Sequence, residues 1–471
     1  MQYIIFGTGD YYERYKKWFD KKDIVALIDN SPAKQNTFID GLEVLAPGEG
    51  IQRNYDVIVI LSFYVKEMKE QLLRLGVDAD KIYHFYDLHR LFQGKAHYYP
   101  VQYYGQAKAI AKADRTSRKK ILLLSQDLTL GGPAIALFHA AVILKKHGYD
   151  VVYASMLDGP LREKLVECGI PVIVDVNLQI AKMNEVKWLE KFSLIFCSTI
   201  NFFVFLSERQ KETPVIWWLH DSAFFYNGVN QEVVRLIDTK NLEVVSVGPV
   251  PENAFHMVVP EIPVKTLLYG TADSYCGKKA CRIKDKIIFV TIGYIEQRKG
   301  QDLLVEAIKK VPQFLREKAE FWLIGQDSSL MAQRLKAEVK NVSEITLKGT
   351  VGREEIDNIL NTADVLVCPS REDPMPTVAA EAMMHEVMCL VSNVTGTAEY
   401  ICDGKNGLIF ESENIEQLSQ KLVWCIQNEQ VLSNMGKEAR KIYEEQFSMH
   451  TFEQNLVGLI NKELKCVERE R

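Results

Sequence analysis

Short apolar segments of strand length alternate with amphipathic helical segments along almost the whole chain. Runs such as YIIF from Tyr3, ILLLS from Ile121 and IIFVTI from Ile287 are each followed by a stretch with helical periodicity. Apolar runs without polar alternation are typical of parallel strands that are buried on both faces, so helices must cover both sides of each sheet. The sequence therefore predicts an α/β protein built from parallel sheets.

The alternating pattern breaks at two places, so we divide the 471 residues into three α/β units. A chain of this length exceeds one ordinary hydrophobic core. The predicted parts are a Rossmann-like accessory domain at 1–90, a basic linker at 91–118, a first lobe at 119–275, a second lobe at 276–450 and a C-terminal helix at 451–471 that packs back on the first lobe. Two consecutive lobes of similar size predict a cleft between them, where ligands bind at the carboxyl ends of the strands.

Charge and cysteine content limit the classes of function. A net charge of -5 argues against a nucleic-acid-binding protein. No apolar run approaches the roughly 20 residues of a membrane span, and the first residues lack the pattern of a signal peptide. The nine cysteines are scattered, and the closest pair, Cys276 and Cys281, has no metal-ligand cluster around it. We therefore expect a cytoplasmic protein with reduced thiols.

The stretch 105–120 is strongly basic, with six Lys or Arg against one Asp. It predicts a linker helix, and the alternative is peripheral contact with the inner face of a membrane.

Charged residues follow the first strand of the second lobe. Strand 287–292 ends at Gly293, and Arg298, Lys299 and Gly300 precede the next helix. Cations at the positive end of a helix are unfavourable unless an anion is bound there. Because Lys and Arg both bind phosphate oxygens, a phosphate-bearing ligand is one interpretation. A solvated turn is the other.

The segment SREDPMPTVAAEAM places three carboxylates around a helix start. Its prolines put the start near Pro376, so Glu372 and Asp373 precede the helix and Glu381 lies inside it. The free N–H groups of the helix start can bind a phosphate, with Asp373 and Glu381 accepting hydrogen bonds from sugar hydroxyls. Acids near a helix start also favour the helix dipole without any ligand, which is the preferred interpretation for Glu372.

Together these motifs resemble glycosyltransferase family 4, a group of retaining, nucleotide-sugar-dependent enzymes. The resemblance covers residues 119–460, and its hallmark is a Glu-x7-Glu motif, here Asp373 and Glu381 in PSREDPMPTVAAEAMM. The segment VSNVTGTAEYICDGKNGLIF is similar to the glycine-containing segment that follows this motif in the family. The resemblance implies a GT-B architecture of two Rossmann-like lobes that face a cleft, here preceded by a small Rossmann-like α/β domain.

The resemblance also implies roles in the second lobe. Lys299 corresponds to the lysine that binds the diphosphate, and Tyr294 stands where the family has an arginine, which leaves Arg298 as its substitute. Glu381 would hold the ribose of the donor and Asp373 the hydroxyls of the sugar. The other implied donor-binding residues are Gly293, Gly349, Val351, Met375, Pro376 and Thr377. The turn that contains Gly349 can also admit a planar group against its backbone, although such turns are common.

The start of the first lobe, SQDLTLGGPAIALFHA, resembles the acceptor side of the family. Gly131 and Gly132 form a tight loop whose backbone can approach the donor phosphate. VIWWLHDSAFF places His220 at a strand end, where the family has a histidine that approaches the transferred sugar; a structural histidine is the alternative. Tyr269 replaces the Asn of a turn that ends this lobe in the family.

The implied activity is sugar transfer with retention at the anomeric carbon. The expected donor is a UDP-sugar and the acceptor a glycan, a lipid-linked glycan or a protein, as in polysaccharide biosynthesis or protein glycosylation. The implied catalytic set is His220, Arg298, Lys299 and Asp373. We expect no metal requirement and no cofactor such as NAD.

The accessory domain carries most of a dinucleotide fingerprint. FGTGDYYERY contains Gly7 and Gly9, and Asp29 ends the next strand 20 residues after Gly9, but Tyr12 replaces the third glycine. Two roles of this domain remain open. It could bind a nucleotide at Gly7, Gly9 and Asp29, or it could dock or position the acceptor. The VDAD sequence at 77–80 is interpreted as a turn and not as a metal motif.

Two other functions remain open. A nucleotide-sugar oxidoreductase or epimerase would use the accessory domain, but its Tyr-x3-Lys pair would be Tyr12 and Lys16, inside the first helix. The other is a non-catalytic partner subunit with a degenerate transferase fold, an alternative favoured by Tyr294 and Tyr269 and opposed by Lys299.

Overall fold

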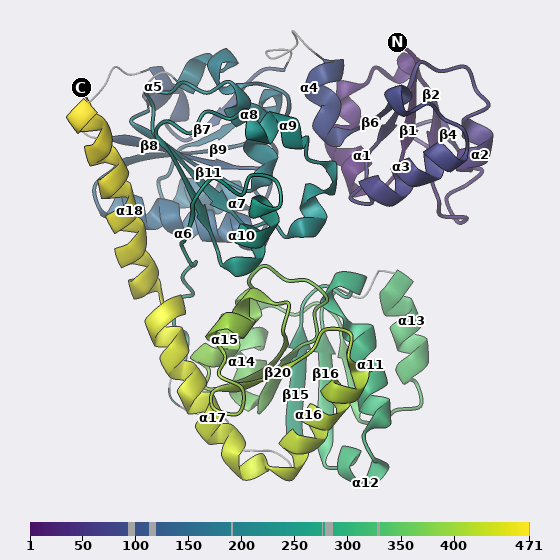
Figure 1. Cartoon of the computed structure of the whole chain (residues 1–471), viewed down its shortest axis with the longest axis vertical. Coiled ribbons are helices and arrows are strands. Elements are labelled where there is room, and N and C mark those ends of the chain that lie inside the picture. Colours follow the sequence, from purple (N-terminus) through teal and green to yellow (C-terminus); the bar gives the residue numbers. More distant parts are fainter. Residues whose placement is uncertain are drawn as a thin grey trace.

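The computed structural model describes residues 1–92, 99–112, 119–189, 192–275, 277, 286–326 and 330–470. These residues form three units, each with one central sheet that is largely parallel (Figure 1). The predicted α/β class is therefore confirmed. Cys276, Cys281 and two parts of the predicted linker, 93–98 and 113–118, lie outside the described residues.

The accessory domain has a six-stranded sheet in the order β3-β4-β2-β1-β5-β6. Its strands are β1 (Tyr3–Phe6), β2 (Ile24–Ile28), β3 (Thr37–Ile39), β4 (Leu42–Leu45), β5 (Val57–Ile60) and β6 (Ile82–His84). Only β3 runs antiparallel to its neighbour. Every residue of β1 and β5 is buried, as their unbroken apolar sequences predict. The helices used below are α1 (Asp10–Tyr15) and α3 (Val65–Arg74).

The first lobe has an eight-stranded sheet in the order β14-β13-β12-β11-β8-β9-β10-β7. Its strands are β7 (Gln102–Tyr104), β8 (Lys120–Ser125), β9 (Asp150–Ser155), β10 (Val172–Val174), β11 (Leu194–Ser198), β12 (Val215–Leu219), β13 (Leu242–Ser246) and β14 (Val264–Thr266). Strand β7 pairs antiparallel with β10, so the range predicted as a linker also contributes an edge strand. Within the same range, helix α5 (Ala107–Lys112) begins the basic stretch.

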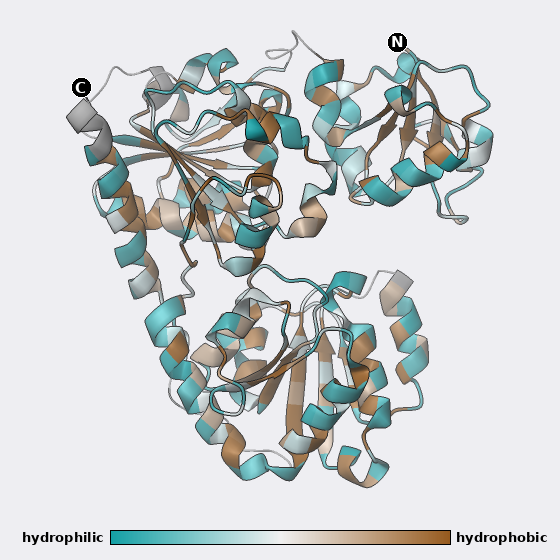
Figure 2. Cartoon of the chain, in the orientation of Figure 1, coloured by the Kyte–Doolittle hydropathy of each residue, from teal (hydrophilic) through white to brown (hydrophobic). Residues whose placement is uncertain are grey.

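The second lobe has a fully parallel six-stranded sheet in the order β17-β16-β15-β18-β19-β20. Its strands are β15 (Ile287–Ile292), β16 (Ala319–Ile324), β17 (Ile345–Lys348), β18 (Val365–Cys368), β19 (Met388–Ser392) and β20 (Gly407–Phe410). Helices α11 (Gln301–Lys310), α14 (Arg353–Thr362) and α15 (Thr377–Met384) each follow a strand of this sheet and position the site described below. Figure 2 shows the apolar residues of both lobes concentrated in the sheets and on the helix faces that cover them.

Helix α18 (Met449–Glu470) leaves the second lobe and runs along the first (Figure 1). Its Glu453 accepts a hydrogen bond from Lys146, at the end of α6 (Gly132–Lys146), with an N–O distance of 3.2 Å. The ring of Phe452 stacks on Trp218 of β12 with a centroid distance of 5.7 Å. The helix therefore ties the two lobes together.

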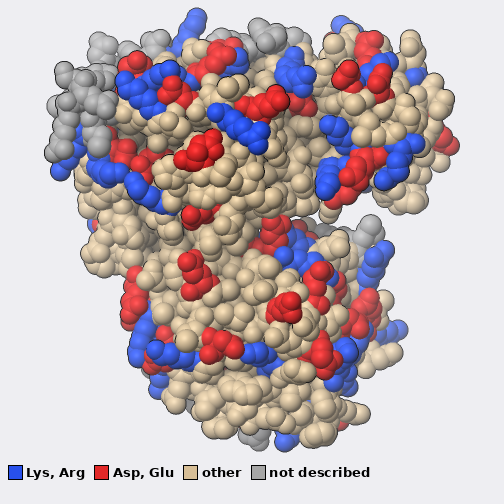
Figure 3. Space-filling model, in the orientation of Figure 1, with Lys and Arg blue, Asp and Glu red and all other residues tan. Residues whose placement is uncertain are grey.

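The accessory domain packs against the first lobe through hydrogen-bonded aromatic side chains. The hydroxyl of Tyr86 donates to Asn201 at 2.5 Å, and the indole of Trp18 donates to Gln179 at 2.6 Å. Both rings are buried in one hydrophobic cluster that continues from the accessory domain into the first lobe. On the face seen in Figure 3, basic and acidic side chains are interspersed. No helix in the described ranges has the length and apolar character needed to cross a membrane.

Candidate active site

Lys299 and Asp373 meet at the carboxyl edge of the second sheet. Lys299 follows β15, Asp373 follows β18, and these two strands are neighbours. The Lys299 ammonium lies 2.6 Å from a carboxylate oxygen of Asp373, whose side chain is only 6% exposed. The sequence predicted both residues as part of one site, and the topology brings them into direct contact.

The loop after β15 is locked against the loop after β18 by backbone contacts. The amide of Arg371 donates to the carbonyl of Arg298 at 2.8 Å. Gly300 has a φ of +69°, and a Cβ atom there would lie 2.0 Å from the carbonyl oxygen of Pro369. Only glycine permits this approach. The position of Lys299 therefore depends on Gly300.

Arg298 lies beside this pair and is held by two acceptors. Its guanidinium donates to a Glu296 carboxylate oxygen at 2.7 Å and to the carbonyl of Glu372 at 3.1 Å. Arg298 and Lys299 lie in a 3₁₀ turn before α11, while Asp302 occupies the first turn of that helix. The cations thus have partners in the protein, and their place in the sequence does not by itself require a bound anion.

Helix α15 begins as predicted, with Pro376 as its N-cap and Thr377 as its first residue. No side chain caps this helix start, so its first N–H groups can receive an external acceptor. The preceding Met375 carbonyl accepts a hydrogen bond from the Tyr269 hydroxyl of the first lobe at 3.4 Å. Tyr269, which departs from the family pattern, thus positions the donor-side loop.

Glu381 lies inside α15 and pairs with Arg353, the first residue of α14. Burial raises the pKa of the Glu381 carboxyl, and the Arg353 guanidinium offsets only part of this rise. Arg353 follows the turn that contains Gly349 and Val351, so the ion pair links the predicted ribose and base contacts. A Cβ atom at Gly349 would meet no other atom within 4 Å, which leaves room beside this turn. Sequence reasoning did not identify Arg353 as a site residue. Its position directly after the glycine turn was the signal that could have indicated it.

The loop between β8 and α6 is also open. Gly131 is the N-cap of α6, with its amide donating to the Thr129 hydroxyl at 3.3 Å. A Cβ atom at Gly132 would have no neighbour within 4 Å. At Gly293, where φ is +152°, the nearest atom to such a Cβ is the Lys299 Cε at 3.9 Å. Space for a ligand therefore exists at both glycine loops.

His220 follows β12 and packs on Trp218 with a ring centroid distance of 4.4 Å. Burial lowers its pKa to about 3, so the imidazole is neutral at physiological pH. Its buried Nε2 has no hydrogen-bond partner among the described residues. The next residue, Asp221, accepts a hydrogen bond from the Ile200 amide at 2.6 Å. Sequence reasoning did not single out Asp221.

The first lobe contacts the donor loop a second time, close to His220. The amide of Phe224 donates to a Glu372 carboxylate oxygen at 3.3 Å. We expected Glu372 to favour the dipole of α15, but it instead bridges the two lobes beside Asp373. The segment that follows His220 is thus joined to the loop that carries Asp373.

Comparisons with known proteins agree with this geometry. Residues 278–442 match the family described as glycosyl transferases group 1, residues 117–246 match glycosyl-transferase family 4, and residues 1–83 match a family described as C2185-like, N-terminal. The structure of Anabaena HepE in complex with UDP-glucose superposes with a TM-score of 0.60 at 17% identity, over 73% of this chain and 100% of that one. Residues 117–246 and 278–442 thus belong to glycosyltransferase families, and the chain has the GT-B fold.

Two relatives show how far this similarity extends. Spore coat protein SA of Bacillus subtilis is 23% identical over 368 residues, which cover 70% of this glycosyltransferase and 95% of the relative. An uncharacterised glycosyltransferase of Methanocaldococcus jannaschii is 31% identical over 158 residues, or 33% of this chain and 43% of the relative. The predicted family and GT-B architecture are confirmed, and the oxidoreductase and partner-subunit alternatives are not favoured.

In the accessory domain of the glycosyltransferase, the fingerprint residues support their own loop. The Asp29 carboxylate accepts hydrogen bonds from the Thr8 amide at 3.0 Å and the Ser31 amide at 2.9 Å. Gly7 has a φ of +102°, and a Cβ atom there would lie 2.7 Å from the Leu61 carbonyl oxygen. A Cβ atom at Gly9 would meet nothing within 4 Å. The Asp29 carboxylate, to which the fingerprint would assign ribose binding, thus already accepts hydrogen bonds from its own loop.

Tyr12 and Lys16, which have the spacing of an oxidoreductase pair, share one partner inside the domain. The Tyr12 hydroxyl donates to Asp40 at 3.1 Å and the Lys16 ammonium donates to the same carboxylate at 2.8 Å. The VDAD segment runs into a short 3₁₀ turn, Ala79–Lys81, which contains its last two residues. Among the residues whose placement is given, no group of three His, Cys, Asp or Glu side chains is arranged to hold a metal ion.

The Asp221→Asn variant should change how the stability of the glycosyltransferase depends on pH. Burial raises the pKa of Asp221 from 3.8 to about 6. The native state therefore favours the protonated carboxyl, and ionisation costs no stability below pH 3.8. As the pH rises from 3.8 through 6, ionisation of the buried carboxyl lowers the free energy of unfolding by up to about 3 kcal/mol. Asparagine cannot ionise, yet it keeps an oxygen for the Ile200 amide. The variant should unfold at a higher temperature than the wild type at pH 8, and at a similar temperature at pH 4. A difference that stays constant over this range would contradict the assignment.

Proposed function

We propose that this glycosyltransferase moves a sugar from a UDP-sugar to a glycan, a lipid-linked glycan or a protein, with retention of configuration and without a required metal ion. The observation that carries the proposal is the contact between Lys299 and Asp373 at the uncapped start of α15. This arrangement supports the proposal because a cation and a free helix N-terminus both favour a leaving diphosphate, and a carboxylate beside them can accept hydrogen bonds from sugar hydroxyls.

The charges of the site support a donor with a leaving diphosphate. Lys299 and Arg298 supply two cations at one edge, so the growing negative charge would be stabilised by protein side chains, and we expect no metal requirement. Glu381, paired with Arg353, is available to accept hydrogen bonds from ribose hydroxyls. The preference for uridine rests on Anabaena HepE, whose structure contains UDP-glucose.

In the proposed reaction the acceptor hydroxyl attacks the anomeric carbon from the face that the diphosphate leaves. The bond from that carbon to the diphosphate oxygen breaks as the new glycosidic bond forms, and the hydroxyl proton passes to the leaving diphosphate. Asp373 holds the transferred sugar through its hydroxyls. His220 is neutral, so its side chain can contact the sugar without repelling the positive charge that develops at the anomeric carbon.

The test is binding of UDP-, GDP- and dTDP-sugars, with and without EDTA. A UDP-sugar at 100 times its Kd should stabilise the protein by about 2.7 kcal/mol, seen as a higher unfolding temperature that EDTA does not change. Retention is then read from the anomeric proton of the product by NMR. Stabilisation by no UDP-sugar, loss of the effect with EDTA, or an inverted product would each contradict the corresponding part of the proposal.

A further inference from the structure

Two short helices run side by side where the accessory domain meets the first lobe. They are α3 and the 3₁₀ helix η9 (Ala223–Gly228), which begins two residues after the strand-end residues His220 and Asp221. At the start of η9, Phe224 contacts Glu372 of the second lobe, next to Asp373. One end of this helix pair therefore lies at the transfer site.

Aromatic rings cluster at that end, and two of them are exposed. The ring of Phe224 lies 6.0 Å from that of Tyr64, the residue that precedes α3, and 6.0 Å from that of Phe63. Phe63 also packs on Tyr11 at 4.3 Å. Tyr64 is 57% exposed and Phe63 is 37% exposed. Large rings that stay exposed beside a binding site often form part of a recognition surface.

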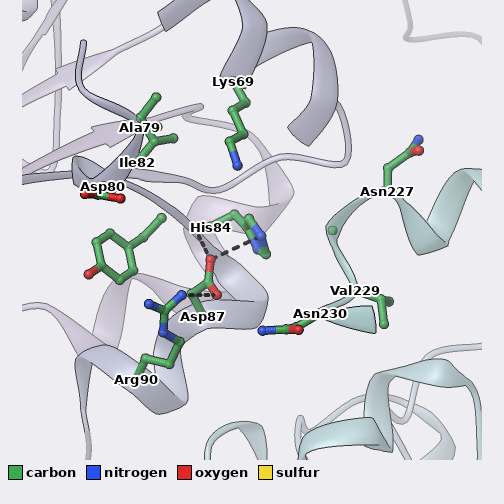
Figure 4. A pocket seen from close by; sticks show the side chains of 12 residues that line it. Lys69, Ala79, Asp80, Ile82, His84, Asp87, Arg90, Asn227, Val229 and Asn230 are labelled. Atoms are coloured by element: carbon green, nitrogen blue, oxygen red, sulfur yellow. Dashed lines mark hydrogen bonds and ion pairs between the residues drawn. The ribbon is translucent and has the colours of Figure 1, made fainter. Parts of the chain in front are cut away.

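A polar cavity of about 490 Å³ lies further along the same two helices (Figure 4). Lys69 of α3 and Asp80 line it from the accessory domain, and Asn227 of η9 lines it from the first lobe. Its volume falls within the range of small-molecule sites, about 300 to 1,000 Å³. The cavity exists only because the two units are docked, since neither unit supplies the whole lining.

The cavity contains one set of residues that is already paired and one that is not. His84 lies 3.1 Å from Asp87, and Arg90 lies 3.4 Å from the other oxygen of that carboxylate, as the dashed lines in Figure 4 show. Within the described parts of the chain, the side chains of Lys69, Asp80 and Asn227 make no hydrogen bond or ion pair. They leave a cation, an anion and an amide available to a ligand.

This combination favours a neutral ligand with many hydroxyl groups. Sugar hydroxyls both donate and accept hydrogen bonds, so they can satisfy Lys69, Asp80 and Asn227 at the same time. A phosphate or a nucleotide would be attracted by Lys69 but repelled by Asp80, whose carboxylate would then face a negative charge. An acyl or polyprenyl chain would remove these polar groups from water without replacing their hydrogen bonds.

We propose that the accessory domain and the first lobe together bind the distal part of a neutral oligosaccharide acceptor. The acceptor passes over Tyr64 and Phe224, and its far end occupies the cavity. The six residues of η9 span about 12 Å at 2 Å per residue, so only an acceptor longer than the sugar that receives the transfer reaches both places. The proposal rests on the proposed transferase activity and gives the accessory domain a role in acceptor selection.

The test uses the whole protein and a panel of neutral mono-, di-, tri- and tetrasaccharides, with binding measured by titration calorimetry. We expect affinity to rise with length and to fall about tenfold or more in Tyr64→Ala and in a Lys69→Ala/Asn227→Ala variant, the equivalent of one or two hydrogen bonds. The matched controls are Phe38→Ala, an exposed ring elsewhere in the accessory domain, and Lys66→Ala, which lies on α3 outside the cavity. The unfolding temperature of each variant confirms its folding.

UDP binding, measured on the same samples, separates this proposal from the transferase assignment. The proposal predicts unchanged UDP affinity in all four variants, because none of their residues lies in the donor site. It is overturned if no oligosaccharide binds the wild type, if length has no effect, or if Tyr64→Ala and the Lys69→Ala/Asn227→Ala variant bind the panel as the wild type does. Binding of polyprenyl phosphate vesicles or of an acidic oligosaccharide in preference to the neutral panel would overturn it as well. Failure of UDP to bind the wild type would instead count against the proposed donor.

Discussion

Replacing Lys299 with alanine should lower the rate of sugar transfer by at least about 10²-fold. The Lys299 ammonium is the cation at the edge of the sheet where the helix start of α15 opens, and it lies 2.6 Å from Asp373. Its charge is needed most when the diphosphate leaves, so the loss should appear in kcat as well as in kcat/KM. Release of UDP from the donor, followed with and without acceptor, measures this step directly.

Two controls separate chemistry from folding for this variant. Lys310→Ala removes an exposed lysine at the C-terminal end of α11, the helix that follows Lys299, where it pairs with Glu416, and should leave the rate unchanged. Lys299→Ala also leaves the buried Asp373 without its partner, so its unfolding temperature must be compared with that of the wild type. A variant that is folded and still transfers sugar at more than a tenth of the wild-type rate would contradict the role of Lys299.

The elements of the fold were predictable because their signals are local. An unbroken apolar run such as 287–292 is a buried parallel strand, and the observed β15 has these bounds. Pro376 restricts the backbone before the helix, and α15 begins one residue later. Strand β7 escaped prediction because it is three residues long and pairs at an edge, where neither periodicity nor burial marks it.

The contacts that complete the site were not predictable, because they join segments far apart in the chain. Arg353 pairs with Glu381, Tyr269 reaches Met375, and Phe224 reaches Glu372, and each pair is brought together only by the packing of complete elements. Sequence reasoning placed Lys299 and Asp373 at one site through the family motif. It did not anticipate that they would contact each other, since that depends on how closely β15 and β18 bring their loops together.

The sequence argument for an anion bound by Arg298 and Lys299 was also limited, because it could not include contacts with residues elsewhere in the chain. Two cations before a helix are unfavourable in isolation. In the structure Arg371 donates two hydrogen bonds to Asp302, in the first turn of α11, and the Arg298 guanidinium reaches Glu296. Arg298 and Lys299 thus each have an acidic partner in the protein, so their place before a helix does not by itself require an anion. The open start of α15 beside Lys299 supplies the further support for a diphosphate.

Replacing Gly300 with alanine should remove both stability and activity. The residue has a φ of +69°, a conformation that costs an L-residue about 1–2 kcal/mol, and its new Cβ would lie 2.0 Å from the Pro369 carbonyl oxygen. The two loops would have to separate, which adds about 1–3 kcal/mol of overpacking. Separation also breaks the 2.8 Å hydrogen bond between Arg371 and Arg298 and moves Lys299 away from Asp373. We expect a lower unfolding temperature together with a transfer rate as low as that of Lys299→Ala.

Gly458→Ala provides the matched control, because it places the same methyl group at an exposed position of α18 with no atom within 4 Å. Alanine is the better helix former there, so this variant should be as stable as the wild type or more stable by about 0.5–1 kcal/mol. Comparing Lys299→Ala with Gly300→Ala then shows why the transfer rate falls. Lys299→Ala loses rate through a missing charge, whereas Gly300→Ala loses rate because the charge is displaced, so only the latter should also lose the protection from proteolysis that the packed loops provide. If Gly300→Ala were as stable and as active as the wild type, the close contact between the loops after β15 and β18 would not be what positions Lys299.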